Sequence, residues 1–83
     1  MDTSARRRQL LWRSKRGLLE LELLLKPFVE SRLGALCGAD LDLYGRLLEH
    51  DDLDIYDWLR GVSQASDSSL QPIIDRIRAL HTP

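Results

Sequence analysis

The sequence is poor in the residues that form disulfides, metal centres and nucleophilic active sites. Its 83 residues include one cysteine, Cys37, and two histidines, His50 and His81. One cysteine excludes an intrachain disulfide, and these three residues do not supply the roughly four ligands of a closed zinc site. A Cys–His catalytic pair stays open on sequence separation alone, but ordinary structural roles for all three residues are favoured. We therefore expect no metal site and no catalytic residue.

Long hydrophobic runs and β-sheet signals are missing as well. No stretch approaches the ~18 consecutive apolar residues of a membrane span, so we expect none. Arg13, Lys15 and Arg16 interrupt the N-terminal apolar stretch, which makes it a poor secretory signal and favours a cytoplasmic protein. No segment alternates apolar and polar residues in the manner of a strand, and no Asn-Gly or Asp-Gly turn occurs. The sequence therefore predicts an all-α protein.

Charge is distributed unevenly, although the net charge is only −1. Residues 1–16 carry six basic side chains and one acidic side chain, whereas residues 17–83 carry six basic and twelve acidic ones. Such asymmetry suggests a surface for a charged partner. No helix rich in Arg, Asn or Gln follows the basic segment, and the acidic remainder opposes phosphate, so we expect no nucleic-acid binding.

Leucine periodicity predicts a compact five-helix bundle that forms a single domain over residues 1–83, with residues 1–4 and 81–83 frayed. The predicted helices cover about 5–15, from 18 to Arg32, about 41–49, from Asp51 to Gly61, and from Ser68 to Leu80. Predicted N-caps are Ser4, Asp40, Asp51 and Ser68, and Gly34 is the predicted residue beyond the end of the second helix.

The second helix is predicted to be the most buried one. Pro27 either ends it near Lys26 or kinks it, and the kink is favoured because the apolar rhythm continues. Trp58 is expected to be buried against this helix. The predicted core comprises Leu10, Leu11, Trp12, Leu18, Leu19, Leu21, Leu23, Leu24, Leu25, Phe28, Val29, Leu33, Leu41, Tyr44, Leu47, Leu48, Ile55, Trp58, Leu59, either Ile73 or Ile74, Ile77 and Leu80.

The segment from Arg16 to Glu20 forms the predicted corner between the first two helices. Gly17 lies between two helical patterns and is expected to adopt a positive φ, which glycine does without strain. Arg16 and Glu20 should then lie close together, with Glu20 in the first turn of the second helix, where the helix dipole favours a carboxylate. Two interpretations stay open here: an ordinary exposed ion pair at a corner, or an exposed recognition patch.

An acidic run, with Glu49, Asp51, Asp52, Asp54 and Asp57, follows the third predicted helix. It would suit a hard cation or a basic partner, but helix capping and a solvated face also explain it. The acids and glycine from Asp40 to Asp51 match part of an EF-hand loop. Tyr44 stands at its fifth position and no glutamate stands at its twelfth, so calcium binding is disfavoured.

Several of these segments together resemble the succinate dehydrogenase assembly factor 2 family, whose bacterial members are called SdhE and were once labelled as an antitoxin. The family's Arg-Gly-x-x-Glu motif is matched by Arg16, Gly17 and Glu20. The other matching segments are Trp12-Arg13, Pro27-Phe28, Leu47-Leu48-Glu49, the acids Asp51, Asp52 and Asp54, and Trp58-Leu59. The resemblance covers residues 6–61, and the tail after Gly61 matches little. Glu22 and Leu53 stand where members often have Asp and Pro.

This resemblance implies a five-helix factor that binds the flavoprotein subunit of succinate dehydrogenase or fumarate reductase. The factor would promote covalent attachment of FAD to a histidine of that subunit by an autocatalytic reaction. It would therefore be no enzyme and hold no cofactor tightly, since the FAD is attached to the client. It would be a monomer or a weak homodimer. The alternative is a small regulatory nucleic-acid-binding or antitoxin-type protein.

The implied partner-binding residues are Arg16, Gly17 and Glu20, with Asp51, Asp52 and Asp54 added, although capping also accounts for the three aspartates. The resemblance places the first three near the flavin site of the client. Gly17 would permit close backbone approach, and the charges of Arg16 and Glu20 would pair with groups of the client.

Overall fold

A computed structural model describes residues 3–81 and contains five α-helices and two short 3₁₀ helices. They are α1 (Thr3–Arg13), α2 (Leu19–Ser31), η1 (Leu33–Ala35), α3 (Gly38–Leu47), α4 (Asp52–Arg60), η2 (Ser68–Leu70) and α5 (Gln71–Ala79). Residues 3–81 contain no strand, so the all-α, five-helix prediction is confirmed. The predicted fraying of residues 1, 2, 82 and 83 lies outside the described part, whereas Thr3 and Ser4 belong to α1.

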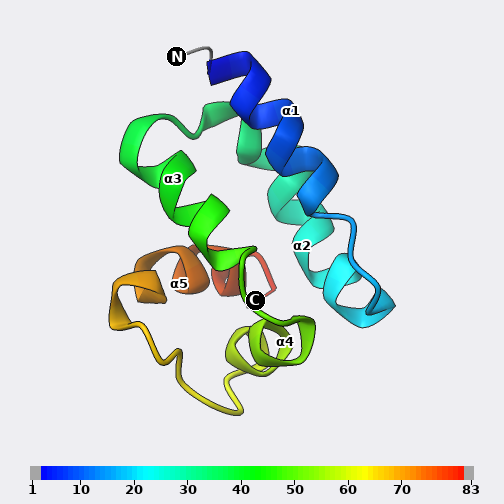
Figure 1. The fold of residues 1–83 in the computed structure, drawn as a ribbon. Coiled ribbons are helices and arrows are strands. Elements are labelled where there is room, and N and C mark those ends of the chain that lie inside the picture. Colours follow the sequence, from blue (N-terminus) through cyan, green and yellow to red (C-terminus); the bar gives the residue numbers. More distant parts are fainter. Residues whose placement is uncertain (1–2, 82–83) are drawn as a thin grey trace.

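The helices form a compact bundle in which α1 packs on α3, and α2 packs on α4 and α5 (Figure 1). α4 and α5 contact each other at the end opposite the N-terminus. The chain leaves α1, turns a sharp corner at residues 14–18 and enters α2 close to the start of α4. This arrangement brings the corner and the acidic segment together, although they are far apart in the sequence.

The core receives side chains from every helix, and the predicted core is confirmed for α3, α4 and α5. Phe28 and Tyr44 lie at its centre, fully buried, with ring centroids 5.2 Å apart. The Tyr44 hydroxyl shares a 2.6 Å hydrogen bond with Ser14, and burial raises the pKa of Tyr44 to about 12. The buried hydrophobic residues are Leu10, Leu21, Leu25, Phe28, Leu33, Leu36, Leu41, Tyr44, Leu47, Leu48, Ile55, Trp58, Leu59, Leu70, Ile73, Ile74 and Ile77.

Four leucine or tryptophan residues predicted for the core lie on the surface instead. Exposed fractions are 45% for Leu11, 71% for Trp12, 62% for Leu19 and 58% for Leu23. Only one face of α1, the face of Leu10, reaches the core. On α2 the buried positions are spaced by three and four residues, as one helical face requires, and the two exposed leucines lie off that face.

Most predicted N-caps were wrong. α1 begins at Thr3, so Ser4 lies inside the helix. α3 begins at Gly38, which places Asp40 in its first turn. Near the C-terminus, Asp67 is the residue that caps, because its carboxylate accepts the Ser69 N–H at 3.0 Å. Short polar side chains cap at several nearby positions, so the pattern locates a helix start only to within a few residues.

The prediction that α2 continues past Pro27 is confirmed, since the helix runs to Ser31. Gly34 was predicted just beyond that helix, but it lies in η1, which follows without a left-handed glycine. Gly61 does end α4 in the left-handed conformation, with φ of 76°. Asp51 occupies the N-cap position of α4 as predicted, although its side chain makes no capping hydrogen bond.

Candidate partner-binding site

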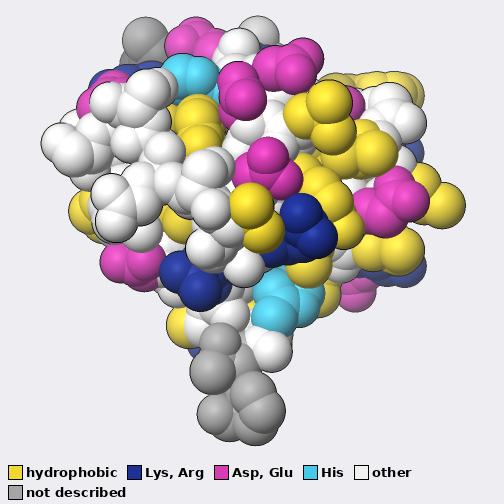
Figure 2. Space-filling model, turned by 90° about the horizontal axis from the view of Figure 1, so that it is seen from below, with side chains coloured by type: hydrophobic (Ala, Val, Ile, Leu, Met, Phe, Trp, Pro, Cys, Tyr) yellow, Lys and Arg dark blue, Asp and Glu magenta, His cyan; other side chains and the backbone are white. Residues whose placement is uncertain are grey.

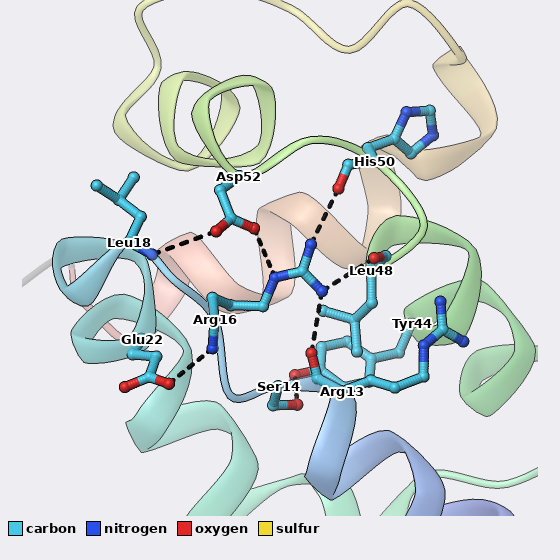
Figure 3. Close-up of polar contacts among 9 residues, drawn as sticks. All are labelled: Arg13, Ser14, Arg16, Leu18, Glu22, Tyr44, Leu48, His50 and Asp52. Carbon is cyan, nitrogen blue, oxygen red and sulfur yellow. Dashed lines mark hydrogen bonds and ion pairs between the residues drawn. The ribbon is translucent and has the colours of Figure 1, made fainter.

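Arg16 lies in the corner between α1 and α2, and its guanidinium cross-links three parts of the chain (Figure 3). Its Nε donates to Asp52 Oδ1 at 2.7 Å. Its Nη1 donates to the carbonyl oxygens of Arg13 and Leu48, and its Nη2 to that of His50, each at 3.0 Å. The side chain thus joins the end of α1, the end of α3 and the start of α4.

The local backbone explains why an arginine fits here. Leu48 and His50 follow the end of α3, where carbonyl groups have no partner within the helix. Such carbonyls also carry the partial negative charge of the helix C-terminus, which favours a cation. Asp52 is the first residue of α4, where the opposite partial charge favours a carboxylate. A planar guanidinium reaches both helix ends at once.

Two carboxylates hold the backbone of the corner. Asp52 Oδ2 accepts the Leu18 N–H at 3.2 Å, and Glu22 Oε1 accepts the Arg16 N–H at 2.6 Å. We call the group of Arg16, Leu18, Glu22 and Asp52 the Arg16 junction. It fixes the corner against the start of α4 through side-chain and backbone bonds together.

The Arg16 junction is partly shielded from water. The side chain of Arg16 is 14% exposed and that of Asp52 is 27% exposed. Desolvation raises the pKa of Asp52, but the hydrogen bond and charge of Arg16 and the N–H groups of Leu18 and Gly17 outweigh it. The pKa of Asp52 is therefore lowered, and its carboxylate is ionised at neutral pH.

The predicted pairing of Arg16 with Glu20 was wrong, because Arg16 pairs with Asp52. Glu20 does lie in the first turn of α2, as predicted, and it is exposed. No residue in the described range 3–81 forms an ion pair or hydrogen bond with its side chain. The helix start turns Glu20 towards solvent, whereas the orphan carbonyls after α3 draw the guanidinium inward.

The predicted positive φ of Gly17 was also wrong. Within residues 3–81, the glycines with positive φ are Gly38 and Gly61. Gly17 is exposed, and a Cβ added to it would lie 3.8 Å from Asp52 Oδ2, an ordinary van der Waals distance. The fold itself therefore does not require glycine at this position.

Asp51 and Asp54 flank Asp52 at the start of α4, and both are exposed. No other side chain in the described range pairs with either of them. The site residues predicted from the sequence thus divide into two kinds. Arg16 and Asp52 are engaged within the chain, whereas Gly17, Glu20, Asp51 and Asp54 face solvent.

Figure 2 views this end of the molecule from below. On the right, where the corner and the start of α2 lie, acidic side chains alternate with hydrophobic ones. Trp58 does not belong to this surface, because it is 7% exposed. Its ring packs edge-on against His50, with centroids 5.0 Å apart. Trp58 therefore supports the segment whose carbonyl binds Arg16, and its predicted burial is confirmed.

Glu22 was not predicted as a site residue. Its position in the first turn of α2 was a usable signal, because acids there often reach back to N–H groups before the helix. The carbonyls of Leu48 and His50 gave no signal, since every residue has one. Their availability depends on where α3 ends.

Residues 3–81 contain no group of three or more His, Cys, Asp or Glu side chains that could hold a metal ion. No helix in this range has the length and apolar character needed to cross a membrane.

The chain is similar to several curated bacterial proteins over most of its length. It is 40% identical over 74 residues to the FAD assembly factor SdhE of Pseudomonas savastanoi, covering 84% of this chain and 88% of that protein. Identity to the protein of the same name from Legionella pneumophila is 37% over 78 residues, covering 94% and 96%. For the Vibrio cholerae protein it is 32% over 79 residues, covering 95% and 92%.

Residues 8–81 match the Sdh5 family, described as the flavinator of succinate dehydrogenase. The match extends beyond Gly61, so the tail that the motifs left out belongs to the family pattern as well. The family resemblance inferred from the combined motifs is thereby confirmed, and the chain belongs to the Sdh5 family of FAD assembly factors.

Proposed function

We propose that this chain binds the flavoprotein subunit of succinate dehydrogenase or fumarate reductase and promotes covalent attachment of FAD to it. The family match over residues 8–81 carries this proposal. The role is that of a chaperone-type assembly factor, and FAD is attached to the partner rather than held tightly by this chain. The cytoplasmic location and the monomeric or weakly dimeric state stay predictions.

The proposed contact surface consists of the exposed residues Gly17, Glu20, Asp51 and Asp54. Glu20 offers the partner a carboxylate that no described residue engages. Beneath this surface, Arg16 and Asp52 fix the corner to α4, so the exposed groups are held in one relative position. Holding a partner in a reactive geometry is an orientation effect, and it needs no catalytic group on the factor.

In this proposal, substitution of Gly17 impairs partner binding and leaves folding intact. Its φ is not positive and a Cβ has room, so the folded chain does not require the absence of a side chain here. A functional loss on substitution would then come from steric conflict with the partner. This gives Gly17 a role that the fold alone does not explain.

The test uses cells that lack their own assembly factor and receive Gly17→Val, Glu20→Ala or the unaltered protein. Covalently held flavin is measured as in-gel fluorescence of the denatured flavoprotein subunit. Asp42→Ala is the matched control, because Asp42 is an exposed acid on α3. We expect both corner variants to lose most of the fluorescence while the control retains it. Circular dichroism should show that all variants are folded.

Full fluorescence with both corner variants would remove the corner from the proposed contact surface. Absence of fluorescence with the unaltered protein and every flavoprotein subunit of its organism would overturn the proposed function. The alternative, a nucleic-acid-binding regulator or antitoxin-type protein, would then be tested by measuring how strongly duplex affinity falls with salt. The family match favours the assembly factor over that alternative.

A further inference from the structure

Exposed hydrophobic residues are concentrated on one side of the molecule. Among residues 3–81, four of the six large exposed ones lie on α1 and in the first half of α2. These four are Leu11, Trp12, Leu19 and Leu23. Scattered apolar residues are normal on protein surfaces, but a concentration of them marks an interaction site.

Three of these residues line a groove between α1 and α2. Leu11 lies on the α1 side, Leu19 and Leu23 lie on the α2 side, and Leu25 and Val29 also line it. The volume of the groove is about 480 Å³. Leu19 also lies within the Arg16–Glu20 motif, so the groove begins at the corner. The groove is therefore continuous with the proposed contact surface.

The α1 edge of this groove is cationic. α1 contains no acidic residue and exposes Arg8, and Lys15, which follows the end of α1, is exposed and lines the groove. The Lys15 ammonium lies 5.3 Å from the centroid of the Trp12 ring. A tryptophan with neighbouring cations has the composition of a binding hot spot, where Trp and Arg are enriched. Such an edge is complementary to acidic side chains on a partner.

We propose that the α1–α2 groove, together with Trp12, is a second docking surface for the flavoprotein subunit. It takes a segment of that subunit with apolar side chains for the groove and acidic side chains for Arg8 and Lys15. This inference rests on the proposed function and extends its contact surface from the corner along α1 and α2. The apolar part supplies affinity, and the charges set the orientation of the segment.

Charge and shape disfavour two other occupants of the groove, a second copy of this chain and a membrane surface. A second copy on a symmetry axis would place one cationic α1 edge near another, and like charges repel. An anionic membrane would meet Glu22 and Glu30, which also line the groove, and a flat bilayer does not fill a concave surface. A partner protein can place acidic side chains at the α1 edge and apolar side chains in the groove, away from Glu22 and Glu30 on α2, whereas a uniformly charged membrane surface cannot.

The test measures binding of the purified flavoprotein subunit to the unaltered chain and to Trp12→Ala and Leu23→Ala. Val62→Ala is the matched control, because Val62 is 62% exposed but lies after α4, away from the groove. We expect the Kd to rise about tenfold or more for Trp12→Ala, and several-fold for Leu23→Ala. The control should stay within about twofold. All three changes are at exposed positions, and thermal melting checks the fold.

A second measurement observes Trp12 directly. The chain is labelled with 5-fluorotryptophan, and its two fluorine resonances are assigned with a Trp12→Phe variant. On addition of unlabelled flavoprotein subunit, we expect the Trp12 resonance to change its chemical shift. The resonance of buried Trp58 serves as the internal reference and should keep its shift.

The outcomes separate this inference from the proposed function. Equal affinity for all variants and an unchanged Trp12 resonance, with tight binding by the unaltered chain, would overturn the groove proposal alone. Failure of the unaltered chain to bind the subunit would overturn both. A dimer in sedimentation that dissociates with Leu23→Ala would assign the groove to a second copy. Binding to anionic vesicles that is lost with Trp12→Ala would assign it to a membrane. Both results overturn the inference.

Discussion

Two arginine–aspartate pairs in this chain differ in almost every respect except their chemistry. Arg16 and Asp52 have side chains 14% and 27% exposed, and Arg16 also binds three backbone carbonyls. Arg46 and Asp67 have side chains 49% and 42% exposed, and Arg46 binds one further group, the Ser69 hydroxyl. The first pair connects three helix ends, whereas the second connects α3 to the loop before η2.

The comparison shows that the surroundings of an ion pair decide its role. An exposed pair contributes only about 0–1 kcal/mol, because water and salt compete for both charges. Loss of a partly buried arginine leaves a carboxylate and several carbonyls without their partner, which costs more than the pair itself contributes. The Arg16 junction is therefore expected to be structural, and the Arg46–Asp67 pair dispensable.

The largest expected effect comes from removing the support beneath the Arg16 junction. Trp58→Ala should lower the free energy of unfolding by about 3–5 kcal/mol, because it deletes a large buried ring that packs on His50. Chemical denaturation measures this loss. Trp12→Ala is the control, since Trp12 is 71% exposed. An unchanged denaturation midpoint for Trp58→Ala would place Trp58 outside the core.

Arg16→Ala tests the junction itself. The sequence suggested an exposed ion pair whose loss is nearly neutral, but the structure predicts a loss of about 2–4 kcal/mol in the free energy of unfolding. Arg16→Lys should recover only part of it, because an ammonium cannot bind Asp52 and three carbonyls in the geometry of a guanidinium. Denaturation of both variants measures the effect. A neutral Arg16→Ala would show that water replaces these bonds.

Asp52→Asn tests how much the charge of Asp52 stabilises the Arg16 junction, through the pH dependence of the free energy of unfolding. The pKa of folded Asp52 lies below its unfolded value of about 3.9, so ionised Asp52 stabilises the fold above about pH 4. This contribution is lost as the pH falls through the lower folded pKa. We expect Asp52→Asn to cost about 1–3 kcal/mol at pH 7, and the difference from the unaltered chain to shrink below about pH 4. Urea denaturation between about pH 2 and about pH 7 measures this difference in the free energy of unfolding.

A difference between the two proteins that stays constant across this range would show that the charge of Asp52 does not stabilise the junction.

The smallest expected effect belongs to the exposed pair. Arg46→Ala should change the free energy of unfolding by about 0–1 kcal/mol, because both side chains are about half exposed and Asp67 keeps its hydrogen bonds to Ser69. Denaturation at low and high salt measures this change. A loss as large as that of Arg16→Ala would contradict the distinction between the two pairs.

Secondary structure and core were predictable where the sequence pattern is regular. Leu21, Leu25 and Phe28 follow the helical period, and they are buried as expected. Leu19 and Leu23 have the same chemistry but lie off that face, and composition alone placed them wrongly in the core. An amphipathic period specifies which residues share a face, whereas a run rich in leucine does not specify how wide the buried stripe is.

The amino-acid sequence by itself determined the all-α class, the five helices, the end of α4 at Gly61 and the family, because these depend on local periodicity, turn residues and motif spacing. Only the tertiary structure decided that Arg16 binds Asp52 and not Glu20, since Asp52 and the carbonyls of Leu48 and His50 lie more than thirty residues away along the chain. Those partners are mostly backbone carbonyls, which become available where α3 ends. A hydrogen-bonding group common to every residue carries no sequence signal until the packing of the helices exposes it.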